Sequence, residues 1–414
     1  MSKTLLLLGG SEAQVAAIEA ANRMGLRTVL CDYLPDNPGR ELADSFYQVS
    51  TTDMEAVLEV ALCESVDGVV AFGSDPAAPT AAYVSQKLKL PGNSYESVSR
   101  LCDKSKFRRF LADNGFKCPS SITLSTGDAE KRVRDAVLGM SFPLVVKPVD
   151  SSGSKGVSVA DSVEDVEEAT LAAFRCSRSG RVIIEEFVRA GYYGVVEGEV
   201  FVVNGAVRSW GLMHSVRGRG INPLVPTVSI HPPRLPKSVD NAIRCEVERL
   251  VRVSRIMNGP MNIEMVIDPC GDVCFIDVGP RNGGNMLAQF YSLVSGKDIV
   301  GATIAVAMGA DVSNSVDYDG RSEYRWVQHI LGSPRAGVFG GLRSSYERGE
   351  HLIELHLYKK PGDRVAPFDN AGQAIGIAFL KFPRKTTDDE ITEFLDGACV
   401  VEASGFELLG GGLR

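Results

Sequence analysis

The stretch "FPLVVKPVDSSGSKGVSV", residues 142–159, places an apolar strand that ends in Lys147 before a loop of serines and glycines. Backbone N–H groups and hydroxyls in such a loop can bind anionic oxygens, and a lysine on each side supplies positive charge. The order is not GxxxxGK[ST], because a strand-like "GVSV" follows where a phosphate-binding loop would continue into a helix. A polar hairpin turn would use the same residues, so this stretch alone leaves both interpretations open.

Acidic residues further along the chain favour the phosphate site. The apolar strand "VIIEEFV" (182–188) carries two adjacent glutamates, and a buried carboxylate requires a hydrogen bond or a nearby cation. Glu264 in "MNIEMVID" and Asp277 in "CFIDVGPR" fall at matching points of two strands joined by the turn "DPCGD". Cross-strand neighbours lie about 5 Å apart, so both carboxylates can hold the same hard cation. A solvated face is the alternative, but both acids lie within apolar strands.

The first hundred residues alternate apolar strands with amphipathic helices, which predicts a small parallel sheet. Asp32 ends the second strand, where a dinucleotide-binding sheet carries its ribose-binding acid. The first turn is "GGSEAQ" and lacks the GxGxxG pattern, so we interpret the sheet as structural. A helix capped by Asp103 and ended by Gly115 predicts a bridge to a second domain, and a smaller α+β unit follows residue 311.

Composition narrows the class of protein. The 414 residues carry a net charge of -8, which argues against nucleic acid as the main partner. The nine cysteines form no CxxC pair, which indicates reduced thiols and a cytoplasmic protein. The four leucines near the N-terminus are too few for a signal sequence, and the apolar runs are too short to span a membrane. We therefore expect no membrane partner.

The order of these parts identifies a family. Lys147 at a strand end, the loop Ser151 to Gly156, "EEFV", Glu264 and "IDVGPRNGG" together resemble the ATP-grasp superfamily, which includes biotin carboxylase, carbamoyl phosphate synthetase, glycinamide ribonucleotide synthetase and the L-amino-acid ligases. The resemblance covers nearly the whole chain and implies an α/β and α+β fold. It implies a Rossmann-like pre-ATP-grasp domain at 1–100, a two-lobed ATP-grasp domain at 101–310 with a lid subdomain at about 120–190, and a small C-terminal α+β lobe at 311–414.

The resemblance also implies roles for individual residues. Lys104 and Lys147 match the two lysines that contact the nucleotide phosphates, and Arg281 matches the arginine that steadies the acyl phosphate. Glu264 and Asp277 match the two metal-binding acids. The mobile lid over the triphosphate is matched by Ser151, Ser152, Gly153, Ser154, Lys155 and Gly156. The hinge segment that contacts adenine is matched by Glu185, Glu186, Phe187 and Val188.

Two departures from the family pattern stand out. Gly279 in "DVGPR" lies where relatives carry a metal-binding asparagine, so we expect either the loss of one ligand or its replacement by Asn282 or Asn285. The glutamate that often opens the hairpin after the hinge is missing as well. Of the nearby acids Glu197 and Glu199, we expect Glu199 to face the cleft.

The family implies a reaction with ATP and Mg²⁺, or Mn²⁺, as cofactors, with two magnesium ions at the β- and γ-phosphates. A carboxylate attacks the γ-phosphorus, and an amine then displaces phosphate from the acyl phosphate to form an amide bond. The implied partners are a small-molecule carboxylate and amine, with a homodimer as the expected assembly. A carboxylase-like enzyme that phosphorylates bicarbonate and an ATP-binding protein without ligase activity are the alternatives.

The sequence offers only a few candidate residues for substrate binding. Asp75 in "FGSDPAAP" follows a first-domain strand at its carboxyl end, where open sheets bind ligands. The segment "MHSVRGRG" holds His214, Arg217 and Arg219, a fork suited to a substrate carboxylate. An exposed basic loop is the equal alternative for that segment.

Overall fold

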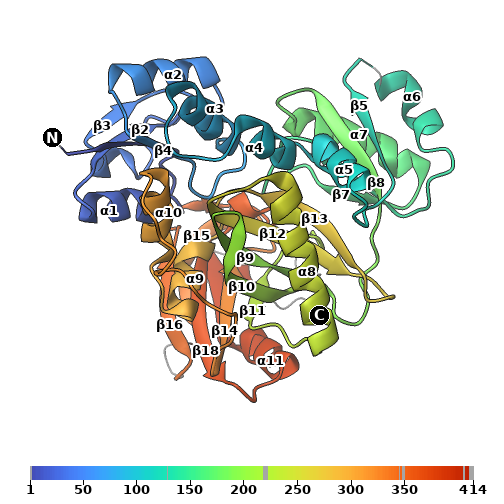
Figure 1. The fold of residues 1–414 in the computed structure, drawn as a ribbon. Helices are drawn as coiled ribbons and strands as arrows, with labels where there is room; N and C mark the ends of the chain where they lie inside the picture. Colours follow the sequence, from blue (N-terminus) through green and yellow to red (C-terminus); the bar gives the residue numbers. More distant parts are fainter. Residues whose placement is uncertain are drawn as a thin grey trace.

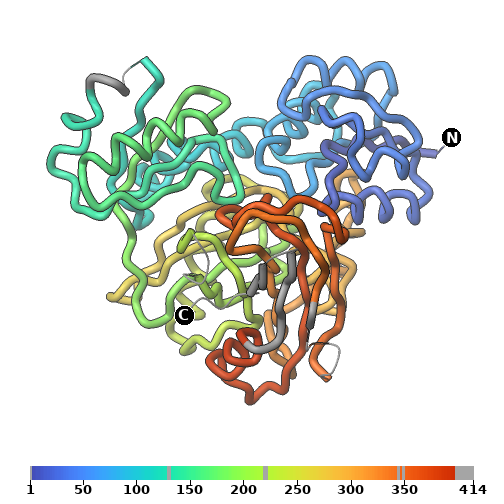
Figure 2. The backbone as a smooth tube through the Cα atoms, turned by 180° about the vertical axis from the view of Figure 1, so that it is seen from behind, coloured from blue at the N-terminus to red at the C-terminus, as the bar shows by residue number. Residues whose placement is uncertain are grey.

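The computed structural model describes residues 2–127, 129–217, 222–344, 346, 350–403 and 406–409. Two small units stand side by side above one large sheet, the N-terminal unit on one side and the unit around residues 121–186 on the other (Figures 1 and 2). The N-terminal sheet is parallel and the remaining sheets are antiparallel, which confirms the predicted fold class.

The N-terminal unit is built on a four-stranded parallel sheet of order β3-β2-β1-β4. Its strands are β1 (Thr4–Leu8), β2 (Arg27–Cys31), β3 (Ser45–Tyr47) and β4 (Gly68–Val70), and its main helices are α1 (Val15–Arg23), α2 (Met54–Cys63), α3 (Ala78–Leu88) and α4 (Tyr95–Cys102). Three of these strands match the predicted ones. The sequence analysis missed β3, because three residues are too few to show an alternating pattern.

Helix α5 (Lys104–Asp113) leads from this unit to the second small unit. The Asp103 side chain accepts hydrogen bonds from the N–H groups of Ser105 and Lys106, which confirms the predicted cap. The second unit is a sheet of order β5-β8-β6-β7. Its elements are β5 (Ser121–Ser125), α6 (Ala129–Ala136), β6 (Leu144–Pro148), β7 (Ser158–Ala160), α7 (Val163–Cys176) and β8 (Arg181–Glu186).

The large sheet has the order β13-β12-β9-β10-β11-β14-β18-β16. The apolar side of α8 packs on one face of this sheet, and α9 and α10 pack on the other (Figure 1). The bounds are β9 (Val195–Val203), β10 (Ala206–Val216), β11 (Val228–His231), α8 (Lys237–Ser254), β12 (Gly259–Ile267), β13 (Val273–Gly279), α9 (Leu287–Ser295), α10 (Ile299–Ala307), β14 (Tyr324–Leu331), β16 (Leu352–Leu357) and β18 (Gly376–Pro383).

Strands β14, β18 and β16 continue the sheet that β9 and β12 begin, so one sheet runs across the predicted boundary at residue 310. The division into domains stays a prediction. The β9–β10 hairpin turns at Asn204 and Gly205, which have positive φ values of 52° and 75°. A further sheet of order β17-β15-β19-β20 and a last helix complete the C-terminal unit, with β15 (Gly337–Ser344), β17 (Arg364–Val365), α11 (Asp388–Ala398), β19 (Cys399–Ala403) and β20 (Phe406–Leu409).

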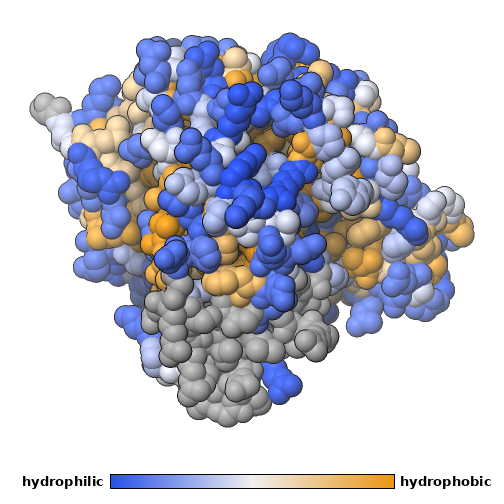
Figure 3. All heavy atoms as spheres, turned by 90° about the horizontal axis from the view of Figure 1, so that it is seen from below, coloured by the Kyte–Doolittle hydropathy of each residue, from blue (hydrophilic) through white to orange (hydrophobic). Residues whose placement is uncertain are grey.

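Polar side chains are interspersed with apolar ones over the face seen from below (Figure 3). Within the described part of the chain, no single helix is long and apolar enough to cross a membrane. Helices α9 and α10 together are long and apolar enough, but the chain bends by 115° between them.

Candidate functional site

A cavity of about 610 Å³ lies where the second small unit meets the large sheet. Most of the predicted site residues line this cavity, which we call the cleft. They are Asp75, Lys104, Lys147, Ser151, Ser152, Gly153, Ser154, Lys155, Glu185, Glu186, Phe187, Val188, Arg217, Glu264, Asp277 and Arg281. Residues separated by up to 206 positions in the chain are therefore brought to one space.

Lys147 is the next-to-last residue of β6 and lines the cleft. Its ammonium is 2.6 Å from Glu185 Oε2 on the neighbouring strand β8, and both side chains are almost fully buried. Arg108 of α5 reaches the same carboxylate, with Nε 2.8 Å from Oε1, and donates a hydrogen bond to the Ile276 carbonyl at 2.5 Å. Burial lowers the pKa of Lys147, whereas Arg108 and Lys147 together lower the pKa of Glu185 against the effect of its own burial.

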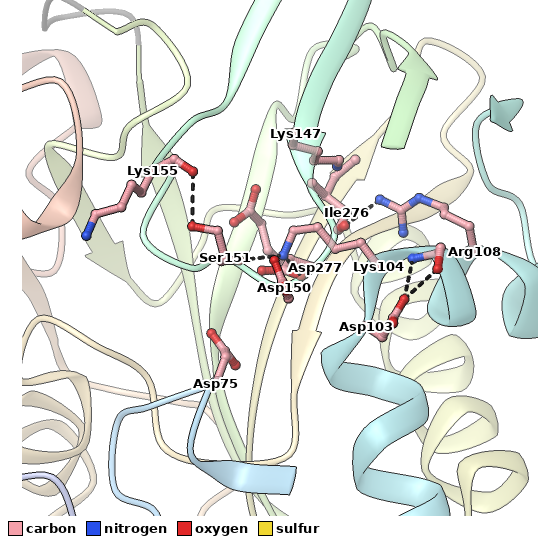
Figure 4. A network of polar contacts seen from close by, with 12 residues as sticks. Asp75, Asp103, Lys104, Arg108, Lys147, Asp150, Ser151, Lys155, Ile276 and Asp277 are labelled. Carbon is pink, nitrogen blue, oxygen red and sulfur yellow. Dashed lines mark hydrogen bonds and ion pairs between the residues drawn. The ribbon is translucent and has the colours of Figure 1, made fainter. Parts of the chain in front are cut away.

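Lys104 begins α5 and connects the two sides of the cleft (Figure 4). Its ammonium donates to Asp277 Oδ1 of β13 at 3.2 Å and to the Ser151 carbonyl at 3.1 Å. The pKa of Asp277 is lowered because Lys104, Lys147 and Arg281 outweigh the burial of the carboxylate. One lysine thus holds both the serine-glycine loop and an acid of the large sheet.

The two predicted metal-binding acids lie directly opposite each other. Glu264 of β12 pairs with Asp277 of β13, and a register shift between Glu264 and Met265 brings the two acids opposite each other. Glu264 also pairs across β12 and β9 with Glu197. The guanidinium of Arg217 lies between these glutamates, with Nη1 2.9 Å from Glu264 Oε1 and Nη2 3.0 Å from Glu197 Oε2.

Arg281 follows β13 and pairs with Asp75, which follows β4 of the N-terminal unit. The pair is bidentate: Nε donates to Asp75 Oδ1 at 2.7 Å, and Nη2 donates to Oδ2. Asp75 raises the pKa of Arg281, although burial opposes that change. The N-terminal unit therefore contributes directly to the cleft, as the position of Asp75 predicted.

The C-terminal unit contributes to the cleft beside the serine-glycine loop. Asn370, Ala371 and Gly372 line the cavity, and the N–H of Ala371 donates to the Gly153 carbonyl at 3.0 Å. The Asn222 side chain bridges the two segments, with hydrogen bonds to the carbonyls of Val157 at 3.4 Å and Asp369 at 3.1 Å. We call residues 369–372 the roof segment.

Comparison with known proteins places this cleft in a family. Residues 103–315 match the model of the carbamoyl-phosphate synthase L chain, ATP binding domain, and this region contains nearly all of the cleft residues described above. The chain belongs to this ATP-grasp family. Its sequence is 27% identical over 263 residues to the carbamoyl phosphate synthase large chain of Thermotoga petrophila, a match covering 62% of this chain and 23% of that protein.

Two solved structures share the ATP-grasp fold over nearly the whole chain. The L-amino acid ligase from Bacillus licheniformis has a TM-score of 0.77 and 21% identity, and the alignment covers 97% of this chain and 99% of that one. The biotin carboxylase domain dimer of the Hydrogenobacter thermophilus 2-oxoglutarate carboxylase, in complex with MgADP and bicarbonate, has a TM-score of 0.73 and 15% identity, with coverage of 97% and 91%. At these identities the likeness shows the fold alone.

Glu199, which we expected to face the ATP-grasp cleft, lies outside its lining. Its side chain has no exposed surface and accepts hydrogen bonds from Asn282 Nδ2 at 2.9 Å and from the Gly283 N–H at 2.8 Å. Burial raises the pKa of Glu199 to about 7. Glu197, two residues earlier on the same face of β9, lines the cleft instead.

Asn282, a candidate metal ligand in the sequence analysis, also lies outside the cleft lining. Its amide nitrogen is turned to Glu199 and Thr303, whereas Asn285, the other candidate, is part of the lining. Asn282 and Glu199 instead hold the loop after β13 against α10. Gly156, at the end of the serine-glycine loop, also lies outside the lining.

His214 is on the face of β10 that points away from the ATP-grasp cleft. Its Nδ1 lies 2.8 Å from Asp388 Oδ2 of α11, and it does not line the cavity. Met213 and Arg217 line the cavity. His214 is offset from Met213 by one position and from Arg217 by three, so alternation along a strand accounts for the difference. Arg219 lies outside the described residues.

The turn after β1 is filled by its own side chains. Asp32 accepts hydrogen bonds from the N–H groups of Gly10 at 2.8 Å and Leu34 at 2.9 Å. Gln14 donates to the carbonyls of Leu8 at 3.2 Å and Phe72 at 2.9 Å, and a Cβ on Gly9 would collide with it. These contacts agree with our interpretation of this sheet as structural.

The sequence analysis missed several residues of the cleft. Arg108 lies four positions after Lys104 on one helix, a spacing that places both on the same face and could have revealed it. The others come from separate elements and showed no local signal: Asn262, Gln328 and the roof segment.

Proposed function

We propose that this protein is an ATP-dependent ligase that joins a carboxylate to an amine through an acyl phosphate. The observation that carries the proposal is that Lys104 and Lys147 lie in one cavity with Asp277 and Glu264, with Arg281 at the same space. A cavity of about 610 Å³ is within the size range of ligand sites. Family membership supports ATP as the nucleotide.

The residues of the cleft suit each stage of this reaction. Lys104 and Lys147 offer charge-assisted contacts to phosphate oxygens, and the N–H groups of residues 151–155 offer further donors. The substrate carboxylate oxygen attacks the γ-phosphorus, and the bond from phosphorus to the β-bridging oxygen breaks to release ADP. The amine then attacks the acyl carbon, loses a proton and releases phosphate. Arg281 is placed to bind the acyl phosphate, and the roof segment limits the entry of water.

The side chains of the cleft supply only some of the ligands that a divalent cation needs. When bound, Mg²⁺ or Mn²⁺ neutralises charge on the nucleotide phosphates. Asp277 and one oxygen of Glu264 fit such an ion, and a solved structural relative holds MgADP. Gly279 offers no side chain, and among the described residues no group of three or more His, Cys, Asp or Glu side chains is placed to hold a metal ion.

A phosphate-release assay with Mg²⁺ and ATP tests the proposal. Single amino acids, pairs of amino acids and bicarbonate are supplied in separate reactions, and products are identified by mass spectrometry. We expect ADP and phosphate to form in equal amounts with a particular carboxylate and amine pair. Phosphate release with bicarbonate alone would indicate a carboxylase-like enzyme, and ATP binding without turnover would indicate a binding protein. The homodimer stays a prediction, which light scattering tests.

A further inference from the structure

Within the described part of the chain, Arg217 makes four polar contacts in the cleft. Besides Glu264 and Glu197, its guanidinium donates to Ser215 Oγ at 3.1 Å and to the Leu224 carbonyl at 3.0 Å. Its side chain is only 15% exposed. An arginine fixed in this way differs from an open fork for a substrate carboxylate, because its donors already face two carboxylates.

The two glutamates share this one guanidinium. Glu197 uses both oxygens, since Oε2 accepts from Arg217 and Oε1 accepts from Ser229 Oγ at 2.6 Å. Glu264 gives Oε1 to Arg217. An arginine guanidinium remains protonated under ordinary conditions, so Arg217 keeps its positive charge between the two carboxylates.

The space beside Gly279 is filled as well. A Cβ at residue 279 would collide with Asp75 Oδ1 and lie 3.0 Å from Arg281 Cζ. The ion pair between Asp75 and Arg281 therefore occupies the volume that a side chain at this position would need. A second cationic group, a guanidinium, lies close to the end of β13.

We propose that Arg217 takes the place of a second divalent cation, so that the cleft binds nucleotide with one divalent cation. That cation is held by Asp277 and the remaining oxygen of Glu264, while Glu197 and Glu264 Oε1 are paired with Arg217. The inference rests on the proposed nucleotide site. It assigns to Arg217 a fixed positive charge that needs no metal and does not change with metal concentration.

The test counts bound Mn²⁺ in the full-length protein. The protein is saturated with a non-hydrolysable ATP analogue, and free Mn²⁺ is measured by electron paramagnetic resonance, with equilibrium dialysis as a second readout. We expect one Mn²⁺ per nucleotide-bound chain. Two Mn²⁺ per chain would overturn the inference while leaving the proposed function intact. A chain that binds no nucleotide would overturn both.

Variants assign the effect to Arg217. In Arg217→Gln the two glutamates lose their cation, so the count should rise to two per chain. Arg217→Lys keeps the charge and should remain at one. Arg208→Gln removes an exposed arginine from the start of the same strand and should also remain at one. A count of one with unchanged Mn²⁺ affinity in Arg217→Gln would overturn the role of Arg217. If that variant does not fold, as judged by circular dichroism, the wild-type and Arg217→Lys counts still decide.

Discussion

Two turns rich in small residues follow buried strands in this protein, and they differ in what satisfies their polar groups. The turn after β1 is completed by Gln14 and Asp32, which lie within 22 residues of it. The loop after β6 is held by Lys104 and Ala371, which belong to other units of the fold. The first turn encloses its own side chains, whereas the second encloses an open cavity.

The difference shows how this fold leaves room for a ligand. Groups that are satisfied by neighbours in sequence collapse into a packed structure. In the cleft, the decisive pairs join distant parts of the chain, with 173 residues between Lys104 and Asp277 and 206 between Asp75 and Arg281. Rigid sheets on both sides hold these charges in place, so the charged groups face a space that they do not fill.

The largest expected effect concerns the cleft. Asp277→Asn removes a charge that faces both Lys104 and the proposed cation, and we expect ATP turnover to fall about 100-fold or more, which corresponds to about 3 kcal/mol. Formation of ADP at saturating Mg²⁺ measures this loss. Asp272→Asn, an exposed change in the turn between β12 and β13, serves as the matched control. Turnover within tenfold of wild type would mean that Asp277 is not required.

Next in size is a pH effect on the support of the cleft. The pKa of Glu199 is raised to about 7, so the stabilisation from its neutral form is fully present below the ordinary glutamate pKa and is lost as pH rises through 7. We expect Glu199→Gln to lack this loss, and its stability relative to wild type should increase by about 2 to 3 kcal/mol between pH 5 and pH 8. Urea unfolding at several pH values measures the difference. Equal pH profiles would contradict the raised pKa, and Glu248→Gln on the exposed side of α8 is the control.

A smaller effect is expected when Lys147 is replaced. Lys147→Ala removes a charge-assisted contact worth about 1.5 to 3 kcal/mol, so nucleotide affinity or rate should fall roughly tenfold to a few hundredfold. Calorimetric titration with ADP measures the affinity. Lys237→Ala, on the exposed first residue of α8, should bind as the wild type does. Unchanged ADP affinity in Lys147→Ala would remove this lysine from the nucleotide site.

The smallest effect tests the filled turn. Gln14→Leu leaves the carbonyls of Leu8 and Phe72 without their donor, and we expect the free energy of unfolding to fall by about 1 to 2 kcal/mol. Nucleotide affinity should stay the same. A loss of nucleotide affinity together with unchanged stability would show that the turn after β1 takes part in binding after all.

The sequence predicted the parts of the site that depend on local spacing. Their places on two strands joined by one turn predict that Glu264 and Asp277 come close together, although a register shift beside Glu264 sets the exact pairing. The Asp103 cap follows from residue type. These features depend on a few neighbouring residues, so a pattern of residue types is enough to recognise them.

What the sequence could not show is how separate elements cover one another. Glu197 and Glu199 lie on the same face of β9, and only the loop after β13, packed over Glu199, decides which of them reaches the cleft. The exclusion of His214, by contrast, follows from strand alternation and could have been predicted. Arg217 could be assigned to the site but not to its partners, because the glutamates come from β9 and β12.

The roof segment bears on how the protein is made. Residues 369–372 complete the enclosure around a loop that is synthesised more than two hundred residues earlier, out of a chain of 414. A ribosome-bound chain that has emerged only as far as β13 carries both lysines and both acids of the cleft but has no cover over them. The enclosure is therefore finished only once the roof segment has been synthesised, so any nucleotide captured before that point would be held without its cover.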